Sequence, residues 1–82
     1  MRIEFTPHSI RDLHRLPRSI QIRIAEKIRF FSKQDNPLKF AERLSKPALG
    51  SFRFRIGDYR VVFDLMDGTI FVLKIAKRDE VY

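Results

Sequence analysis

Arginine alternates with large apolar residues in the second half of the sequence, and this alternation places cations where they could hold an anion. Arg53 and Arg55 lie within the stretch 52–56, and Arg60 follows the dipeptide Gly57-Asp58. A glycine-first dipeptide between two alternating stretches predicts a two-residue hairpin turn. Successive strand residues point to opposite faces, so this turn would place Arg55 directly opposite Arg60 and all three arginines on one face.

Three guanidinium groups on one sheet face are a conflict that folding alone does not explain. Like charges directly opposite each other destabilise a sheet, and local conflicts of this kind tend to mark functional sites. A bound phosphate would relieve the repulsion, because a planar guanidinium donates two parallel hydrogen bonds to phosphate oxygens. The alternative is that Asp58 and Asp64 neutralise the cluster on a solvated face. Continuing the alternation through the turn at Asp67-Gly68 predicts that the same face carries Phe71, Leu73 and Ile75.

Other chemistries have little support in the sequence. His8 and His14 have no partner at a metal-ligand spacing, and the chain has no cysteine. No serine–histidine–aspartate grouping and no glycine-rich phosphate loop is evident. We therefore expect neither a metal nor a cofactor.

Composition bounds the class of protein. The chain has 82 residues, of which 44% are hydrophobic, and this suits one domain spanning residues 1–82. Seventeen lysines and arginines against ten acidic residues give a net charge of +7. Such an excess favours a nucleic acid, an anionic membrane surface or an acidic protein as partner, or simply serves solubility. The apolar runs are too short to span a membrane and the first residues lack a signal-peptide core, so we expect a cytoplasmic protein.

The N-terminal half predicts one strand and two helices. Residues 2–6 alternate as in a short strand, and Thr6-Pro7 is typical of the start of a helix over about 7–15. Leu16-Pro17 breaks this helix and restarts a second one, which ends at Asp35-Asn36-Pro37. The inward side of the first helix would carry Ile10, Leu13 and His14, and that of the second Ile20, Ile24, Ile28 and Phe31.

The C-terminal half predicts three strands. Residues 36–50 show no clear period, and we expect a packed loop or a short helical turn there, held by Phe40, Leu44 and Leu49. After Ser51 the period becomes two, which predicts strands over 52–56, 59–66 and 69 to about 76. The order βααβββ predicts an α+β fold, with one antiparallel sheet and both helices on a single face. The face toward the helices would carry Phe52, Phe54, Ile56, Tyr59, Val61, Phe63 and Leu65.

The whole chain resembles the RelE/ParE superfamily of toxins from bacterial and archaeal toxin–antitoxin modules. The strongest stretch is 52–63, with its basic strand, glycine turn and Tyr59-Arg60, and the end of the chain carries an arginine followed by a final tyrosine. The Leu16-Pro17 break, Asn36-Pro37 and the segment 44–50 also match. The resemblance implies the RelE-like microbial RNase fold and a toxin that an acidic cognate antitoxin inhibits.

The superfamily has two branches with different activities. Members similar to RelE cleave mRNA in the ribosomal A site, with contacts to 16S rRNA, whereas ParE-like members inhibit DNA gyrase and are not nucleases. The arginines and the chain end resemble the RNase branch more closely. There the ribose 2′-hydroxyl attacks the adjacent phosphorus and gives a 2′,3′-cyclic phosphate, while cations stabilise the developing charge. The resemblance assigns Arg60 to the scissile phosphate, Arg78 to the leaving oxygen and Tyr82 to a nucleotide, with Arg53 and Arg55 holding phosphates.

The general base of such a reaction has no clear counterpart in this sequence. Some relatives use a lysine at the position of Ser51, and the histidine that commonly precedes the C-terminal arginine is Lys77 here. Arginine stays protonated and is a poor base. Lys46 and Lys77 are therefore the RNA-binding residues left to accept the proton. A ParE-like gyrase inhibitor and a catalytically decayed RNA-binding module are the alternative functions.

Overall fold

Two α-helices and five strands, joined by short 3-10 turns, make up residues 1–80, the part of the chain that the computed structural model describes. In chain order they are β1 (Arg2–Phe5), α1 (Pro7–His14), α2 (Arg18–Ser32), η1 (Pro37–Phe40), β2 (Ala41–Arg43), η2 (Pro47–Leu49), β3 (Phe52–Ile56), β4 (Tyr59–Met66), β5 (Thr69–Lys77) and η3 (Arg78–Glu80). Tyr82, to which the resemblance assigned a nucleotide, lies outside the described residues. Within them, no helix is long and apolar enough to cross a membrane.

The strands form one sheet in the order β1-β5-β4-β3-β2. Antiparallel pairing joins β2 to β3, β3 to β4 and β4 to β5, whereas β1 runs parallel to β5. Both helices and three strands separate β1 from β5 along the chain, so no hairpin turn imposes an antiparallel direction on this pair. The predicted α+β fold is confirmed, and the sheet is mixed rather than wholly antiparallel.

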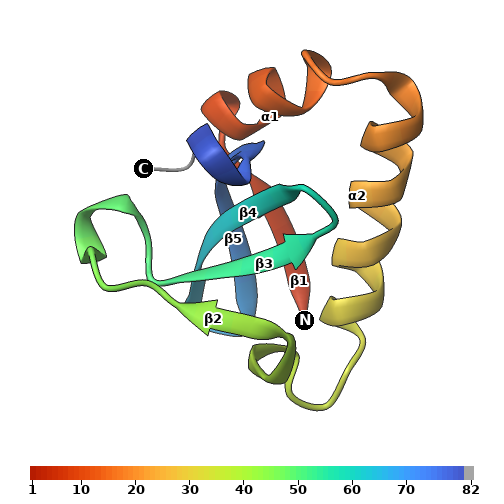
Figure 1. Ribbon diagram of the computed structural model, residues 1–82. Coiled ribbons are helices and arrows are strands. Elements are labelled where there is room, and N and C mark those ends of the chain that lie inside the picture. The colour runs from red at the N-terminus through yellow and green to blue at the C-terminus, as the bar shows by residue number, and fades with distance from the viewer. Residues whose placement is uncertain (81–82) are drawn as a thin grey trace.

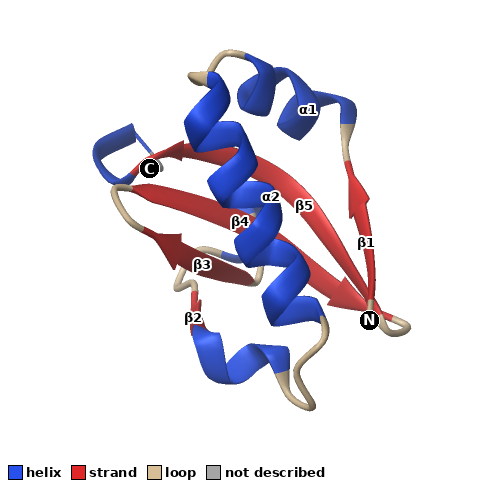
Figure 2. Ribbon diagram, turned by 90° about the vertical axis from the view of Figure 1, so that its right-hand side faces the viewer, coloured by secondary structure: helices blue, strands red, loops and turns tan. Residues whose placement is uncertain are grey.

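Helix α2 lies across one face of the sheet and buries the predicted apolar surface (Figures 1 and 2). Its residues Ile24, Ile28 and Phe31 are buried, as the helical spacing predicted. The ring of Phe31 lies 4.6 Å from that of Phe54, which in turn stacks 4.3 Å from Phe63. Aromatic pairs of this kind contribute about 0.5–1.5 kcal/mol each beyond the area they bury. The loop that contains η2 lies on the opposite face (Figure 1).

Helix α1 packs against β5 with a side that includes the predicted Leu13 but not His14. Its N-cap is Thr6, as expected, whose hydroxyl oxygen accepts a hydrogen bond from the Ser9 N–H at 3.2 Å. Leu13 packs against the core, but His14 is exposed, and the buried residues of this helix are Ser9 and Asp12. The prediction for His14 was wrong because the Asp12 carboxylate turns inward to bind the β5 backbone.

The segment 36–50 contains a strand that its sequence did not indicate. Strand β2 extends the sheet beyond β3, with Ala41 opposite Phe54. It follows the η1 turn, at whose start the Asn36 side chain accepts a hydrogen bond from the Leu38 N–H at 3.2 Å. A three-residue strand is too short to show a period, and its pairing depends on a partner about ten residues away. The loop after β2 holds η2, a single helical turn of the kind expected for this segment.

A β-bulge changes the register between β4 and β5. Val62 lies opposite Lys74, but the next residue, Phe63, lies opposite Val72, so Leu73 is the extra residue. Ile75 consequently joins the core beneath the helices rather than the arginine-bearing face, and the prediction for Ile75 was wrong. Phe71, which precedes the bulge, lies opposite Asp64 as the predicted register requires.

Candidate functional site

The register of the β3–β4 hairpin is the predicted one. Arg55 lies opposite Arg60, and Ile56 lies opposite Tyr59 across the Gly57-Asp58 turn. Strand residues at alternate positions share a face, so Arg53, Arg55 and Arg60 all lie on the side of the sheet away from α2. We call these three residues the arginine face. Their guanidinium groups come from two adjacent strands, as the sequence predicted.

A carboxylate from β2 lies among these arginines. Glu42 is opposite Arg53 in the register, and its Oε1 lies 3.5 Å from the Arg53 Nε and 3.7 Å from the Arg55 Nε. This carboxylate against three guanidinium groups leaves a net charge of +2. Sequence reasoning missed Glu42 because β2 was not recognised. Asp64, which the alternative reading assigned to neutralisation, accepts a hydrogen bond from the Ser51 N–H at 2.8 Å.

Arg60 is held in place by the backbone of the turn. It is only 6% exposed, and its Nη1 donates hydrogen bonds of 2.9 Å to the carbonyl oxygens of Gly57 and Tyr59. A buried cation is costly unless such partners satisfy it. A guanidinium has five N–H donors in a fixed fork, so these bonds also fix its orientation. Arg60 therefore stabilises the turn and contributes a charge with little freedom to move.

Arg78 lies at the same turn. Its backbone N–H donates to the carbonyl oxygen of Asp58 at 2.9 Å, which ties η3 to the end of the β3–β4 hairpin. The Arg78 side chain is exposed, with its Nε 3.7 Å from the Asp79 carboxylate. Lys77 lies opposite Tyr59, which packs against the core, and is therefore at the end of the helix-covered face rather than on the arginine face. Lys77 and Arg78 line one cavity of about 390 Å³ together with Tyr59.

Lys46 belongs to the loop between β2 and β3, which projects on the side of the sheet away from α2 (Figure 1). Leu44 at the start of this loop is buried against Val62 of β4. At its other end, a Cβ added to Gly50 would lie 2.5 Å from the Val62 Cγ1, so only glycine allows this close approach. The loop is thus fixed at both ends to Val62, on the same side of the sheet as the arginine face, and Lys46 is exposed between them. The predicted role of Tyr82 stays a prediction, because that residue is not described.

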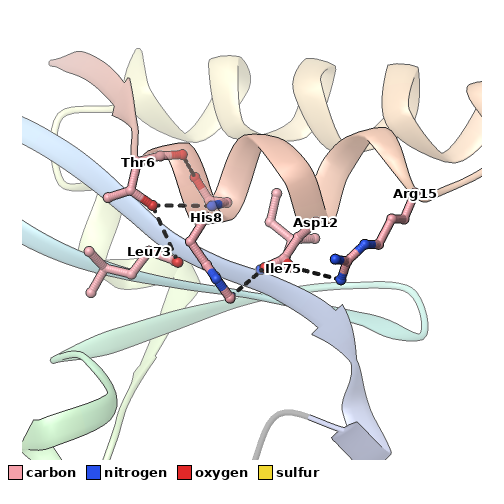
Figure 3. A network of polar contacts seen from close by, with 7 residues as sticks. Thr6, His8, Asp12, Arg15, Leu73 and Ile75 are labelled. Carbon is pink, nitrogen blue, oxygen red and sulfur yellow. Dashed lines mark hydrogen bonds and ion pairs between the residues drawn. The ribbon is translucent and has the colours of Figure 1, made fainter.

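A polar network at the edge of β5 was not predicted from the sequence (Figure 3). The Asp12 carboxylate accepts a hydrogen bond of 3.0 Å from the buried Ile75 N–H. It also lies 3.4 Å from the His8 Nε2 and 4.0 Å from an Arg15 nitrogen. The spacing of His8, Asp12 and Arg15 places them on one side of a helix, and this was the only signal available. No group of three or more metal-ligating side chains occurs among residues 1–80.

These observations describe a class: a small, basic α+β protein with three arginines on the sheet face away from α2. Comparison with known proteins then identifies the family. The model described as ParE toxin of type II toxin-antitoxin system, parDE, matches residues 3–82. The chain is also 30% identical over 82 residues to Toxin RelG of Mycobacterium tuberculosis, covering 98% of this chain and 93% of that relative. The protein therefore belongs to the RelE/ParE superfamily of type II toxin–antitoxin toxins.

Solved structures support the same assignment. The toxin–antitoxin complex RelBE2 of Mycobacterium tuberculosis matches with a TM-score of 0.78 and 30% identity, covering 94% of this chain and 96% of that chain. The archaeal RelE–RelB complex of Pyrococcus horikoshii OT3 matches with a TM-score of 0.74 and 26% identity, covering 96% of both chains. The predicted RelE-like fold is thus confirmed.

Proposed function

We propose that this toxin is an endonuclease that cleaves mRNA on the ribosome, in the cytoplasm. The observation that carries the proposal is the pair Arg55–Arg60, two like charges opposite each other on the sheet face away from α2, with Arg55 exposed and Arg60 buried beside it. On this side of the sheet three arginines and Lys74 oppose Glu42 and Asp64, which leaves a net +2 for a polyanion. An RNA backbone supplies such charges, and its phosphates fit the guanidinium fork.

The proposed chemistry is an attack of the ribose 2′-oxygen on the adjacent phosphorus. The P–O5′ bond breaks, the departing 5′-oxygen takes a proton from water, and the products are a 2′,3′-cyclic phosphate and a 5′-hydroxyl. Arg55 and Arg60 would stabilise the extra negative charge of the phosphorane, and Arg53 would hold a neighbouring phosphate. Because Arg60 is already oriented by the turn, little reorganisation is needed as that charge develops. Arg78 would lie beside the departing 5′-oxygen, and Tyr82 would stack on a nucleotide.

The proton of the 2′-hydroxyl needs an acceptor. Lys46 and Lys77 are the candidates, and each could act only in its uncharged form. Both lysines are exposed, and we assign the role to Lys77 because it lines the same cavity as Arg78. Lys46 would instead hold RNA. In a transcript-cleavage assay, Lys77→Gln should then reduce the rate of the chemical step more than Lys46→Gln does.

We further propose an acidic antitoxin as the partner that inhibits this toxin. The net charge of +7 favours an acidic chain. The two solved structures described above are themselves complexes of a toxin with an antitoxin. Contacts between exposed charges weaken as salt screens them, so the complex should dissociate faster at higher ionic strength.

The proposed activity can be tested by inducing the protein in bacterial cells and mapping RNA 5′ ends. We expect growth arrest with new 5′-hydroxyl ends inside codons, and about 10²–10³-fold slower cleavage for Arg78→Ala, as for loss of one charge-stabilising group. Arg29→Ala is the matched control, because Arg29 is also exposed and lies in the last turn of α2, on the side of the sheet away from the arginine face. Growth arrest with intact messages would disprove the nuclease.

A gyrase inhibitor is the second candidate, since the matching family model is named for ParE toxins. It predicts DNA-damage signalling without message cleavage in the same experiment. A catalytically decayed RNA-binding module predicts normal growth on induction.

A further inference from the structure

A second charged cavity lies between α1, the C-terminal half of β5 and η3. Its volume is about 330 Å³, within the range of small-molecule sites. Its charged and polar lining consists of His8, Asp12, Arg15, Lys74, Lys77 and Glu80. Apart from Lys77, these residues have no part in the arginine face or in the proposed chemistry.

The cavity exists because a helix replaces a strand at this edge of the sheet. Within residues 1–80, strand β1 pairs with Thr69–Val72 alone, so on this edge the rest of β5 has α1 as its neighbour. A strand would lie about 4.8 Å away, whereas a helix with its side chains is about 10–12 Å across and cannot approach as closely. Asp12 bridges the gap at one point, through its bond to the Ile75 N–H, and leaves space on either side.

Charge in this cavity favours an anion. Arg15, Lys74 and Lys77 contribute three positive charges against two carboxylates, with histidine counted as neutral. The Asp12 carboxylate is already engaged with the Ile75 N–H, with His8 and with Arg15. Arg15 is 76% exposed in its side chain, so most of its donors face solvent.

The cavity adjoins the arginine face. Lys74 lies opposite Val62, on the same side of the sheet as Arg60, and Ala76 lies opposite Arg60 itself. The lining of the cavity therefore begins one strand spacing, about 4.8 Å, beyond the residue assigned to the scissile phosphate. A single nucleotide can span the distance between neighbouring strands.

We propose that this cavity is an RNA subsite for the nucleotide next to the scissile phosphate. Lys74 and Arg15 bind the phosphate of that nucleotide, and Leu16 and Ala76 provide apolar contact for its ribose or base. The proposal rests on the proposed mRNA-cleaving function and extends it by a second binding position.

The test is a charge-deletion scan on ribosomes programmed with mRNA. The A-site codon is 2′-O-methylated so that it cannot be cleaved, and one phosphate at a time is replaced by a neutral methylphosphonate. Toxin affinity is measured for the wild type and for Arg15→Gln/Lys74→Gln. The matched control is Arg29→Gln/Lys33→Gln, which removes the same charges near the far end of α2 from α1 (Figure 2).

We expect one linkage beside the scissile position at which the neutral replacement weakens wild-type and control binding about threefold to tenfold, as for loss of one exposed charge contact. The Arg15→Gln/Lys74→Gln variant should show no further loss at that linkage. Its slope of log affinity against log salt should also fall by about 0.7 for each phosphate that the variant no longer binds.

Each other outcome would disprove either the subsite or the proposed function. If the variant keeps the sensitivity of the wild type at every linkage, the cavity does not bind mRNA and the subsite is disproved. A uniform loss of affinity, independent of which phosphate is neutral, would assign the two cations to ribosomal RNA and would also overturn the proposal. If the wild type neither binds programmed ribosomes nor cleaves unmodified message on them, the proposed function itself fails.

Discussion

The hydrogen bond from Ile75 to Asp12 allows a quantitative prediction. Asp12 is 9% exposed, and Asp12→Ala would leave the buried Ile75 N–H without its acceptor. An unsatisfied buried donor costs about 1–3 kcal/mol. The contacts of Asp12 with His8 and Arg15 involve exposed partners and add little, about 0–1 kcal/mol. Alanine is the better helix former, but this recovers at most about 0.7 kcal/mol. We therefore expect Asp12→Ala to destabilise the protein by about 1–3 kcal/mol.

Asp12→Asn separates the hydrogen bond from the charge. The asparagine oxygen can still accept from the Ile75 N–H, so this variant should lose less than about 1 kcal/mol. For a domain of this size, about 1 kcal/mol shifts Tm by about 4–8 °C, so the two variants should differ by roughly 10 °C. Thermal unfolding followed by circular dichroism measures this difference. Asp35→Ala is a control for the general effect of removing an exposed carboxylate.

Amide hydrogen exchange at Ile75 gives a local readout of the same bond. Protection of this N–H should fall in Asp12→Ala and persist in Asp12→Asn. Because Arg78 follows shortly after Ile75 in the chain, loosening of this edge should also slow cleavage in the alanine variant. Equal stability and equal protection in the two variants would refute the reasoning, since the acceptor oxygen would then make no difference.

Three further predictions follow from the site. Glu42→Gln should tighten binding of uncleavable RNA about two- to fivefold at low salt, because it removes the negative charge that β2 places beside the β3 arginines. Unchanged affinity would mean that the RNA binds elsewhere on the protein. Gly50→Ala should lower the free energy of unfolding in urea more than Gly68→Ala does. Both glycines have positive φ, but only at Gly50 would an added Cβ collide with a neighbouring atom, the Val62 Cγ1. Equal losses would show that the loop moves to accommodate the Cβ. Arg60→Ala should lower both the Tm and the rate of RNA cleavage, because it breaks two part-buried hydrogen bonds to the turn as well as removing a charge. An unchanged Tm would mean that these bonds do not stabilise the turn.

Local patterns in the sequence determined the helices, the hairpins and the arginine face. The helical spacing of Ile24, Ile28 and Phe31 identifies the inward side of α2, and the Gly57-Asp58 turn sets Arg55 opposite Arg60. Both depend on residues within a single helix or a single hairpin. Within one helix or one hairpin, the direction of each side chain follows from the regular backbone geometry, so the residue pattern was sufficient to predict it.

Only the tertiary structure decided which distant residues meet. Strand β1 joins β5 in parallel, the bulge at Leu73 moves Ile75 into the core, and Asp12 reaches the β5 backbone across 63 residues of sequence. Glu42 likewise joins the arginines because β2 pairs at the sheet edge. These contacts pair backbone groups and charges that meet only when the elements pack together. The local spacing of residues in the sequence therefore does not predict them.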